Sequence, residues 1–273
     1  MLTKITFTGA DNSVNPEELI EFSQQYPFVE WGILFAGFEM INQPRFPTTQ
    51  WVNRLTELHT KSDKMSQFCA HLCGTLVKKI LLSKQDKKTY DILTNPIFTR
   101  VQLNTHGKRH RYNEQMISLL TFSDYFKERN KFLLNIESKS KEKIPQQGTE
   151  YIFQHDGENN ELLALAKDKK VNVAALFDTS HGAGILPSTW PEALHNIHCG
   201  YAGGLSPENI LEELPKIEAA AAGRQYWIDM ETHVRSNDFT KFDMKKVESV
   251  VAQILKAQYI EPKQKSASTS PRA

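Results

Sequence analysis

Side chains that can move protons or bind anions recur along this chain at the ends of short apolar runs. Asp178 ends one such run, and Gly203 with Gly204 ends the next. The other polar residues at the ends of runs are Thr8, His71, Asn104, His106, Gln154, Asp156, Asp229 and Glu231, with His181 close behind Asp178. Carboxyl and imidazole groups are common general acids and bases. These residues predict a catalytic or binding site assembled from many short segments.

Two features suit an anionic ligand. Gly203 and Gly204 precede Ser206-Pro-Glu-Asn209, a sequence typical of the first turn of a helix. Glycines let the backbone approach a ligand, and free N–H groups at a helix start can hold an oxyanion; a tight turn before a capped helix is the alternative. Arg45 lies in a long loop and could clamp a carboxylate, or it could be an ordinary surface arginine.

The elements that must position these residues alternate along the chain. Buried apolar runs predict eight strands, at residues 4–9, 29–36, 66–73, 100–106, 150–155, 171–178, 196–203 and 225–231. Helical patterns follow most of them, including 15–26, 48–61, 160–169, a short helix from 188, 206–222 and 243–258. Strands that each feed a helix predict a single-domain α/β fold, the (βα)8 TIM barrel, whose active site lies on the loops after the strands. A doubly wound sheet of six or seven strands is the alternative, although no G-x-G-x-x-G supports it.

The barrel is predicted to span residues 1–260, with an insertion around 107–148 and a disordered tail at 261–273. Thirty-three basic and 32 acidic side chains give a net charge of +1, so we expect no nucleic-acid partner. No apolar run approaches the ~20 residues of a spanning helix, and we expect no membrane partner. Three cysteines and the absence of a signal peptide predict a cytoplasmic protein, either a monomer or a homodimer. Cys69 and Cys73 are expected to pack rather than to bind zinc.

Five motifs together resemble phosphoribosylanthranilate isomerase, a phosphate-binding βα barrel of tryptophan synthesis. The sequence YAGGLSPENI at 201–210 is nearly identical to the family's seventh-strand motif, L-A-G-G-L-[TS]-P-E-N-[VI]. The other four are similar: GILF at 32–35 with QPRF at 43–46, VQLN at 101–104, LFD at 176–178 with HGAG at 181–184, and IDMETHVR at 228–235. The resemblance covers about residues 4–257.

The resemblance implies an Amadori rearrangement with an aspartate after strand six as general acid, which is Asp178 here. It implies that Arg45 meets the substrate carboxylate and that Gly203 and Gly204 bind phosphate. Further substrate-binding candidates are Asn104, Gln154, His181, Gly182, Gly184 and Asp229, and further phosphate-binding candidates are Thr232, His233 and Arg235.

The chain also departs from the family pattern. The family's general base is a cysteine after strand one, and that position falls at Thr8. A threonine hydroxyl is too weakly acidic to replace a thiolate directly. Candidate bases are therefore His71, Asp229, Glu231 and His181. Glu231 also brings a negative charge where the family has a small serine, and Arg235 could compensate for it.

We therefore expect an isomerase-like enzyme without a cofactor, acting on a small phosphorylated or otherwise anionic substrate, with Asp178, Thr8, His71 and Glu231 as catalytic residues. Two alternatives stay open. One is a metal-dependent lyase or hydrolase that uses His71, Asp178, Asp229 and Glu231 as ligands. The other is a non-catalytic ligand-binding barrel.

Overall fold

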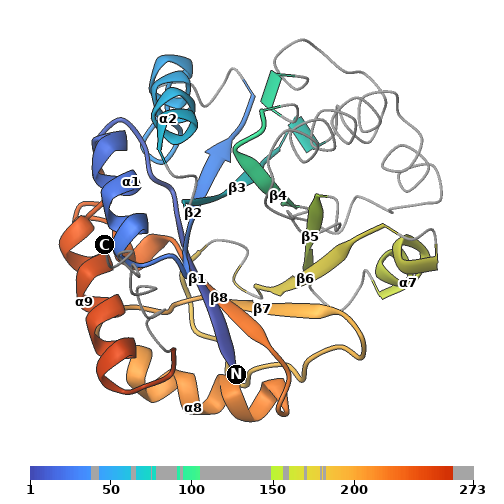
Figure 1. Ribbon diagram of the computed structural model, residues 1–273. Helices are drawn as coiled ribbons and strands as arrows, with labels where there is room; N and C mark the ends of the chain where they lie inside the picture. Colours follow the sequence, from blue (N-terminus) through green and yellow to red (C-terminus); the bar gives the residue numbers. More distant parts are fainter. Residues whose placement is uncertain are drawn as a thin grey trace, which may run out of the picture.

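Eight parallel strands close into a barrel in the order of the sequence (Figure 1). The computed structural model describes residues 1–37, 43–62, 66–74, 76–77, 91–92, 95–104, 149–155, 160–168, 171–178, 180 and 183–260. The strands are β1 (Leu2–Thr8), β2 (Val29–Phe35), β3 (Gln67–Leu72), β4 (Phe98–Leu103), β5 (Glu150–His155), β6 (Val173–Phe177), β7 (His198–Ala202) and β8 (Tyr226–Met230). The predicted (βα)8 barrel is confirmed. The expected insertion, the expected tail, His106 and Asp156 lie outside the described residues.

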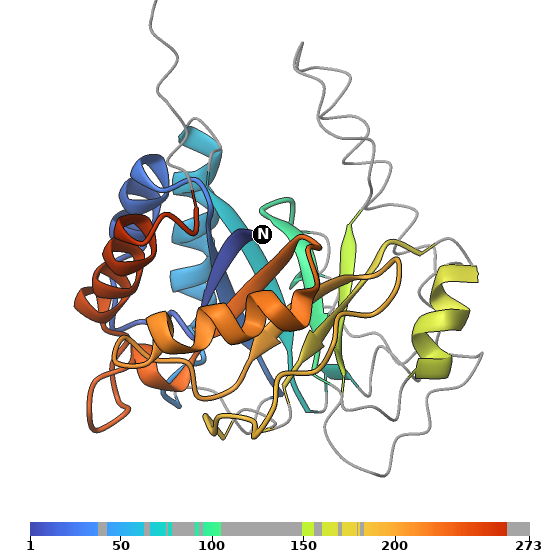
Figure 2. The ribbon, with the colours of Figure 1, turned by 90° about the horizontal axis from the view of Figure 1, so that it is seen from below.

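Helices lie outside the ring of strands. They are α1 (Pro16–Gln25), α2 (Thr49–Lys61), α7 (Asn160–Asp168), α8 (Ile210–Ala221) and α9 (Met244–Lys256), with a 3-10 turn, η2 (Thr232–Val234), after β8. In the side view of Figure 2, α8 crosses in front of the strands. The first helix begins as its sequence predicts, because the side chain of Asn15 caps it and proline occupies its first turn. Its apolar side, with Leu19 and Ile20, is buried against the barrel.

One predicted helix is absent from the structure, and another begins later than predicted. Residues 188–195 form no helix, and this segment runs irregularly from β6 to β7. Its buried Trp190 donates an indole hydrogen bond to Glu213 of α8 at 2.8 Å, which anchors the irregular chain without helical geometry. The helix α8 begins at Ile210 rather than Ser206, because the side chain of Asn209 accepts from the N–H of Ser206 and holds a turn there.

The interior of the barrel has layers, because alternate residues of each strand point inward. Near the amino ends of the strands, Arg100 pairs with Glu30 at 2.7 Å and with Glu150 at 2.6 Å. A buried apolar cluster consists of Cys69, Ile152, Ala174, Leu176, Ala202 and Trp227. Trp227 fills the barrel because Gly200 faces it, and a Cβ on Gly200 would lie 2.1 Å from the indole. These layers close the floor beneath the carboxyl ends of the strands.

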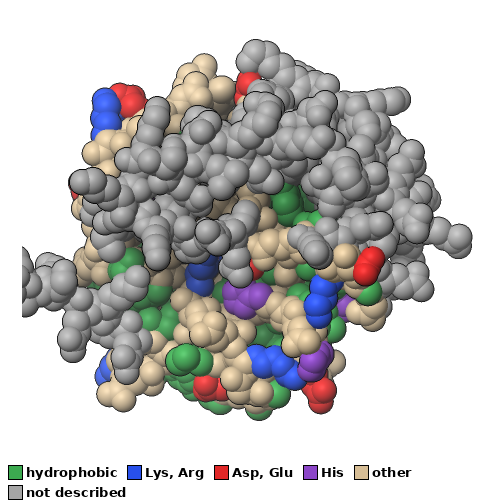
Figure 3. Space-filling model, turned by 45° about the vertical axis from the view of Figure 1, so that its right-hand side comes forward, with side chains coloured by type: hydrophobic (Ala, Val, Ile, Leu, Met, Phe, Trp, Pro, Cys, Tyr) green, Lys and Arg blue, Asp and Glu red, His purple; other side chains and the backbone are tan. Residues whose placement is uncertain are grey.

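The surface carries both signs of charge. On the face seen in Figure 3, the basic and acidic side chains of the described residues are scattered rather than gathered into one patch. This mixture agrees with the net charge of +1. No helix in the described part of the chain has the length and apolar character needed to cross a membrane.

Candidate active site

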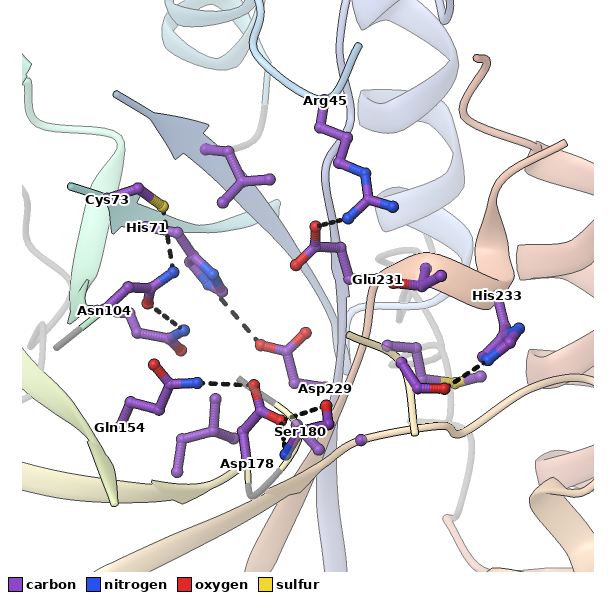
Figure 4. A pocket seen from close by; sticks show the side chains of 18 of the residues that line it. Arg45, His71, Cys73, Asn104, Gln154, Asp178, Ser180, Asp229, Glu231 and His233 are labelled. Carbon is purple, nitrogen blue, oxygen red and sulfur yellow. Dashed lines mark hydrogen bonds and ion pairs between the residues drawn. The ribbon is translucent and has the colours of Figure 1, made fainter. Parts of the chain in front are cut away.

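A cavity of about 440 Å³ opens at the carboxyl ends of the strands. Its lining includes twelve of the predicted site residues: Arg45, His71, Asn104, Gln154, Asp178, Gly184, Gly203, Gly204, Asp229, Glu231, Thr232 and His233. Figure 4 shows their polar side chains converging from opposite sides of the barrel. The expectation that strand ends assemble one site therefore agrees with the structure for these residues.

Two of the predicted residues that the structure describes, Thr8 and Arg235, do not line this cavity. Thr8 is buried beneath it and reaches the site only through Asp229. Arg235 is fully buried in a neighbouring network. His181 and Gly182 lie outside the residues that the structure describes.

Three hydrogen-bond donors surround the carboxyl group of Asp178. One oxygen accepts from Gln154 Nε2 at 2.7 Å, and the other accepts from the N–H of Ser180 at 3.1 Å and from its hydroxyl at 2.8 Å. Gln154 projects from β5 and Ser180 follows β6, so neighbouring segments fix the carboxyl group at the cavity wall. An ionised carboxylate accepts hydrogen bonds and donates none, so this set of donors matches it.

Asp229, from β8, lies at the centre of the site in a different environment. Its Oδ1 accepts from the hydroxyl of Thr8 at 2.7 Å, and its Oδ2 lies 3.9 Å from Nε2 of His71. The side chains of both Asp229 and His71 are buried. Within the described residues, Nε2 of His71 has no hydrogen-bond partner, and no lysine or arginine pairs with Asp229.

Burial favours the uncharged form of both groups. It raises the pKa of Asp229 well above its ordinary value, and the nearby charge of Glu231 adds to this effect. Burial also lowers the pKa of His71 to about 3. Burial therefore favours a protonated Asp229 beside an uncharged imidazole.

A glycine on the neighbouring strand makes room for this pair. A Cβ on Gly32 would lie 2.2 Å from Oγ1 of Thr8 and 2.9 Å from Nε2 of His71. Real Cβ atoms do not approach other atoms so closely. The lack of a side chain at position 32 therefore leaves room for both Thr8 and His71 beside Asp229.

Arg45 and Glu231 form an ion pair at the mouth of the cavity, with 2.6 Å between Nη1 and Oε1. Burial raises the pKa of Glu231, although Arg45 opposes this effect. The backbone of Arg45 has a left-handed φ of 80°, and its N–H donates to Asp11 Oδ2 at 2.6 Å. Asp11 thus holds Arg45 in a conformation that non-glycine residues rarely adopt. The resemblance implies that the Arg45 guanidinium binds a substrate carboxylate, but here it is already paired with Glu231.

Arg235, a predicted phosphate-binding residue, does not line the cavity. Its guanidinium donates to the carbonyl of Gly9 at 2.7 Å and to Asp11 Oδ2 at 2.7 Å. It also donates to the carbonyls of Phe239 and Thr240. This fully buried side chain joins the loops after β1 and β8, so all its directed contacts are internal.

The glycine turn after β7 lines the cavity and has backbone N–H groups that are open to a ligand. Within the described residues, no acceptor bonds to the N–H of Gly203, Gly204 or Leu205. The N–H groups of Ser206 and Glu208 already have side-chain acceptors, so the helix start itself is not the anion cradle that the sequence suggests. The open donors lie one turn earlier, in the glycine segment.

The loop after β6 packs closely against this turn. A Cβ on Gly204 would lie 2.4 Å from the backbone nitrogen of Leu186. The carbonyl of Gly184 lies 2.9 Å from Nε2 of His233, and a Cβ on Gly184 would lie 2.9 Å from Cβ of Thr232. The glycines therefore allow the loops after β6, β7 and β8 to pack closely together. This role is independent of any role in binding a ligand.

Sequence reasoning missed Gln102 and Cys73, which bond to the predicted Asn104 on the opposite wall. Gln102 Nε2 donates to Asn104 Oδ1 at 2.8 Å, and Asn104 Nδ2 donates to Cys73 Sγ at 3.2 Å. Burial raises the pKa of Cys73 to about 12, so its thiol stays protonated. Gln102 precedes Asn104 by two residues on one strand, and this spacing alone could have placed both on the inner face.

The metal-dependent alternative finds little support in this geometry. In the part of the chain that the structure describes, no three His, Cys, Asp or Glu side chains gather as a metal site.

No protein-family model matches the chain, and no curated protein is significantly similar to it in sequence.

Proposed function

We propose that this barrel is an isomerase-like enzyme that moves protons on a small anionic substrate, and that it is related to phosphoribosylanthranilate isomerase. The observation that carries the proposal is the presence of two carboxyl groups with contrasting surroundings in one cavity. Asp178 has three donors, whereas Asp229 is buried beside an uncharged histidine. Environments that separate two carboxyl groups in this way supply an acid and a base together.

Two groups support an anionic substrate. The open N–H groups of Gly203, Gly204 and Leu205 suit a phosphate or carboxylate oxygen. Arg45 supplies a positive charge at the mouth, although Glu231 competes for it. The proposal includes a cytoplasmic location, which the free thiols of Cys69, Cys73 and Cys199 support.

The proposal is tested by thermal-shift titration with inorganic phosphate, ribose 5-phosphate and 2-aminobenzoate. A ligand that binds only the folded protein raises the melting temperature. Arg45→Gln should weaken the response, and Glu231→Gln should strengthen it because Arg45 loses its internal partner. Arg54→Gln is the matched control, since Arg54 is an exposed arginine of α2 that pairs with Glu17.

Proton transfer is tested separately, by proton NMR of ribose 5-phosphate incubated with the protein in D₂O. Exchange of the hydrogen next to the carbonyl carbon is expected, because an isomerase of this kind removes that hydrogen. The proposal fails if none of the three ligands stabilises the protein and no exchange occurs.

A further inference from the structure

The two carboxyl groups of the cavity differ in the hydrogen bonds that they accept. Asp178 receives three donors from Gln154 and Ser180, which use acceptor sites on both of its oxygens. Asp229 receives one donor, from Thr8, and its other oxygen lies 3.9 Å from the nearest histidine nitrogen. That distance exceeds a hydrogen bond. Asp178 is thus set up as an ion, and Asp229 as a neutral acid.

The surroundings of Asp229 strengthen this contrast. Three acidic groups, Glu231, Glu30 and Asp178, add to the rise in its pKa. Its partner Thr8 is uncharged, and burial keeps His71 uncharged. A buried carboxyl group without a counterion holds its proton, because isolated charge is costly away from water.

We infer that the acid and base roles are exchanged relative to those that the resemblance implies: Asp178 is the general base, and Asp229 is the general acid. This inference rests on the proposed function. Both side chains line the same cavity, so one substrate can contact both. Thr8, at the position of the family's cysteine base, is a positioning residue that orients Asp229.

The proton transfers balance for a substrate with a carbonyl or imine carbon next to a carbon bearing hydrogen and a hydroxyl group. Asp178 takes the proton from that neighbouring carbon, whose C–H electron pair forms the carbon–carbon double bond. Asp229 gives its proton to the carbonyl oxygen or imine nitrogen. The hydroxyl proton of the enol then passes to Asp229, and Asp178 returns its proton to the original carbonyl or imine carbon. Both residues end as they began.

Carboxyl ¹³C NMR tests the starting protonation states without any ligand. Protein labelled at aspartate Cγ is titrated from pH 5 to 9, and the two resonances are assigned with Asp178→Asn and Asp229→Asn. At pH 7 we expect the Asp229 resonance at the protonated position. Two ionised resonances, or the reverse assignment, would overturn the inference. Thr8→Val should raise the titration midpoint of Asp229, whereas a threonine that only packs would leave it unchanged.

Deuterium exchange into ribose 5-phosphate separates the two roles. Asp178→Asn should slow exchange at carbon by about 100-fold or more, whereas Asp229→Asn should retain slow exchange because the base is intact. The opposite pattern would restore the family's assignment. If wild-type protein neither binds nor exchanges any ligand, the proposed function fails, while the titration still decides which carboxyl group holds a proton.

Discussion

The hydroxyl of Thr8 donates to the carboxyl group of Asp229 at 2.7 Å and so ties the end of the first strand to the last strand of the closed barrel. These residues are 221 positions apart in the chain. Thr8, at the position where the resemblance predicts a cysteine, is therefore joined to a buried acid. In the proposed function, Asp229 therefore carries the chemistry at this end of the barrel and Thr8 positions it.

Asp229→Asn should change how stability depends on pH. The folded pKa of Asp229 is raised, so its contribution to stability is present below the unfolded value near 3.8 and is lost as pH rises towards the folded value. The amide cannot titrate and resembles the protonated acid. We therefore expect the variant to gain stability relative to wild type between pH 5 and 8, as measured by urea unfolding. A uniform loss at every pH would contradict a protonated Asp229.

His71→Gln should affect the acid side of the same curve. The pKa of His71 falls from 6.5 to about 3 on folding. Between these pH values the unfolded chain therefore binds a proton at His71 that the native protein does not bind. Wild-type stability should therefore decline as pH falls from 6.5 to 3, and the variant should decline less. Urea midpoints at pH 7, 5.5 and 4 measure this difference. Parallel curves for the two proteins would show that His71 titrates alike in both states.

Gly32→Ala should destabilise the protein by about 1–3 kcal/mol through overpacking. The new Cβ would lie 2.2 Å from Oγ1 of Thr8, which has to move and release Asp229. Combining the change with Thr8→Ala removes that hydroxyl and should recover part of the loss. A double-mutant cycle by chemical unfolding measures the coupling, and strictly additive effects would exclude the predicted clash.

Arg235→Met should mainly lower stability, whereas Arg45→Met should mainly weaken anion binding. Loss of the fully buried Arg235 leaves the carboxylate of Asp11 without its ion-pair partner and should cost about 3–5 kcal/mol. Loss of the partly exposed Arg45 should cost about 1 kcal/mol or less but weaken anion binding. Unfolding curves and phosphate titrations of both variants test the pair. Normal stability in Arg235→Met would contradict its place in the buried network.

Gly200→Ala should be far more costly than Gly223→Ala. A Cβ at position 200 would lie 2.1 Å from the rigid indole of Trp227, which fills the barrel. At Gly223 nothing lies within 4 Å, although its φ of 76° strains alanine. We expect about 1 kcal/mol for Gly223→Ala and a larger loss for Gly200→Ala. Equal melting temperatures of the two variants would show that the indole can move aside.

The sequence by itself determined the barrel, the helix that begins after Asn15, and most residues of the cavity wall. These features depend on local patterns: apolar runs bury strands, capping residues start helices, and the carboxyl ends of parallel strands meet at one rim. Local pattern failed at residues 188–195, where a tertiary contact of Trp190 replaces the predicted helix.

Only the tertiary structure decided what the polar residues do there. In the tertiary structure Arg235 binds Asp11 rather than lining the cavity, and Glu231 forms an ion pair with Arg45. The tertiary structure also gave Asp178 three donors and Asp229 one. Protonation and pairing depend on burial and on neighbours from distant parts of the chain, and no spacing along the sequence contains that information.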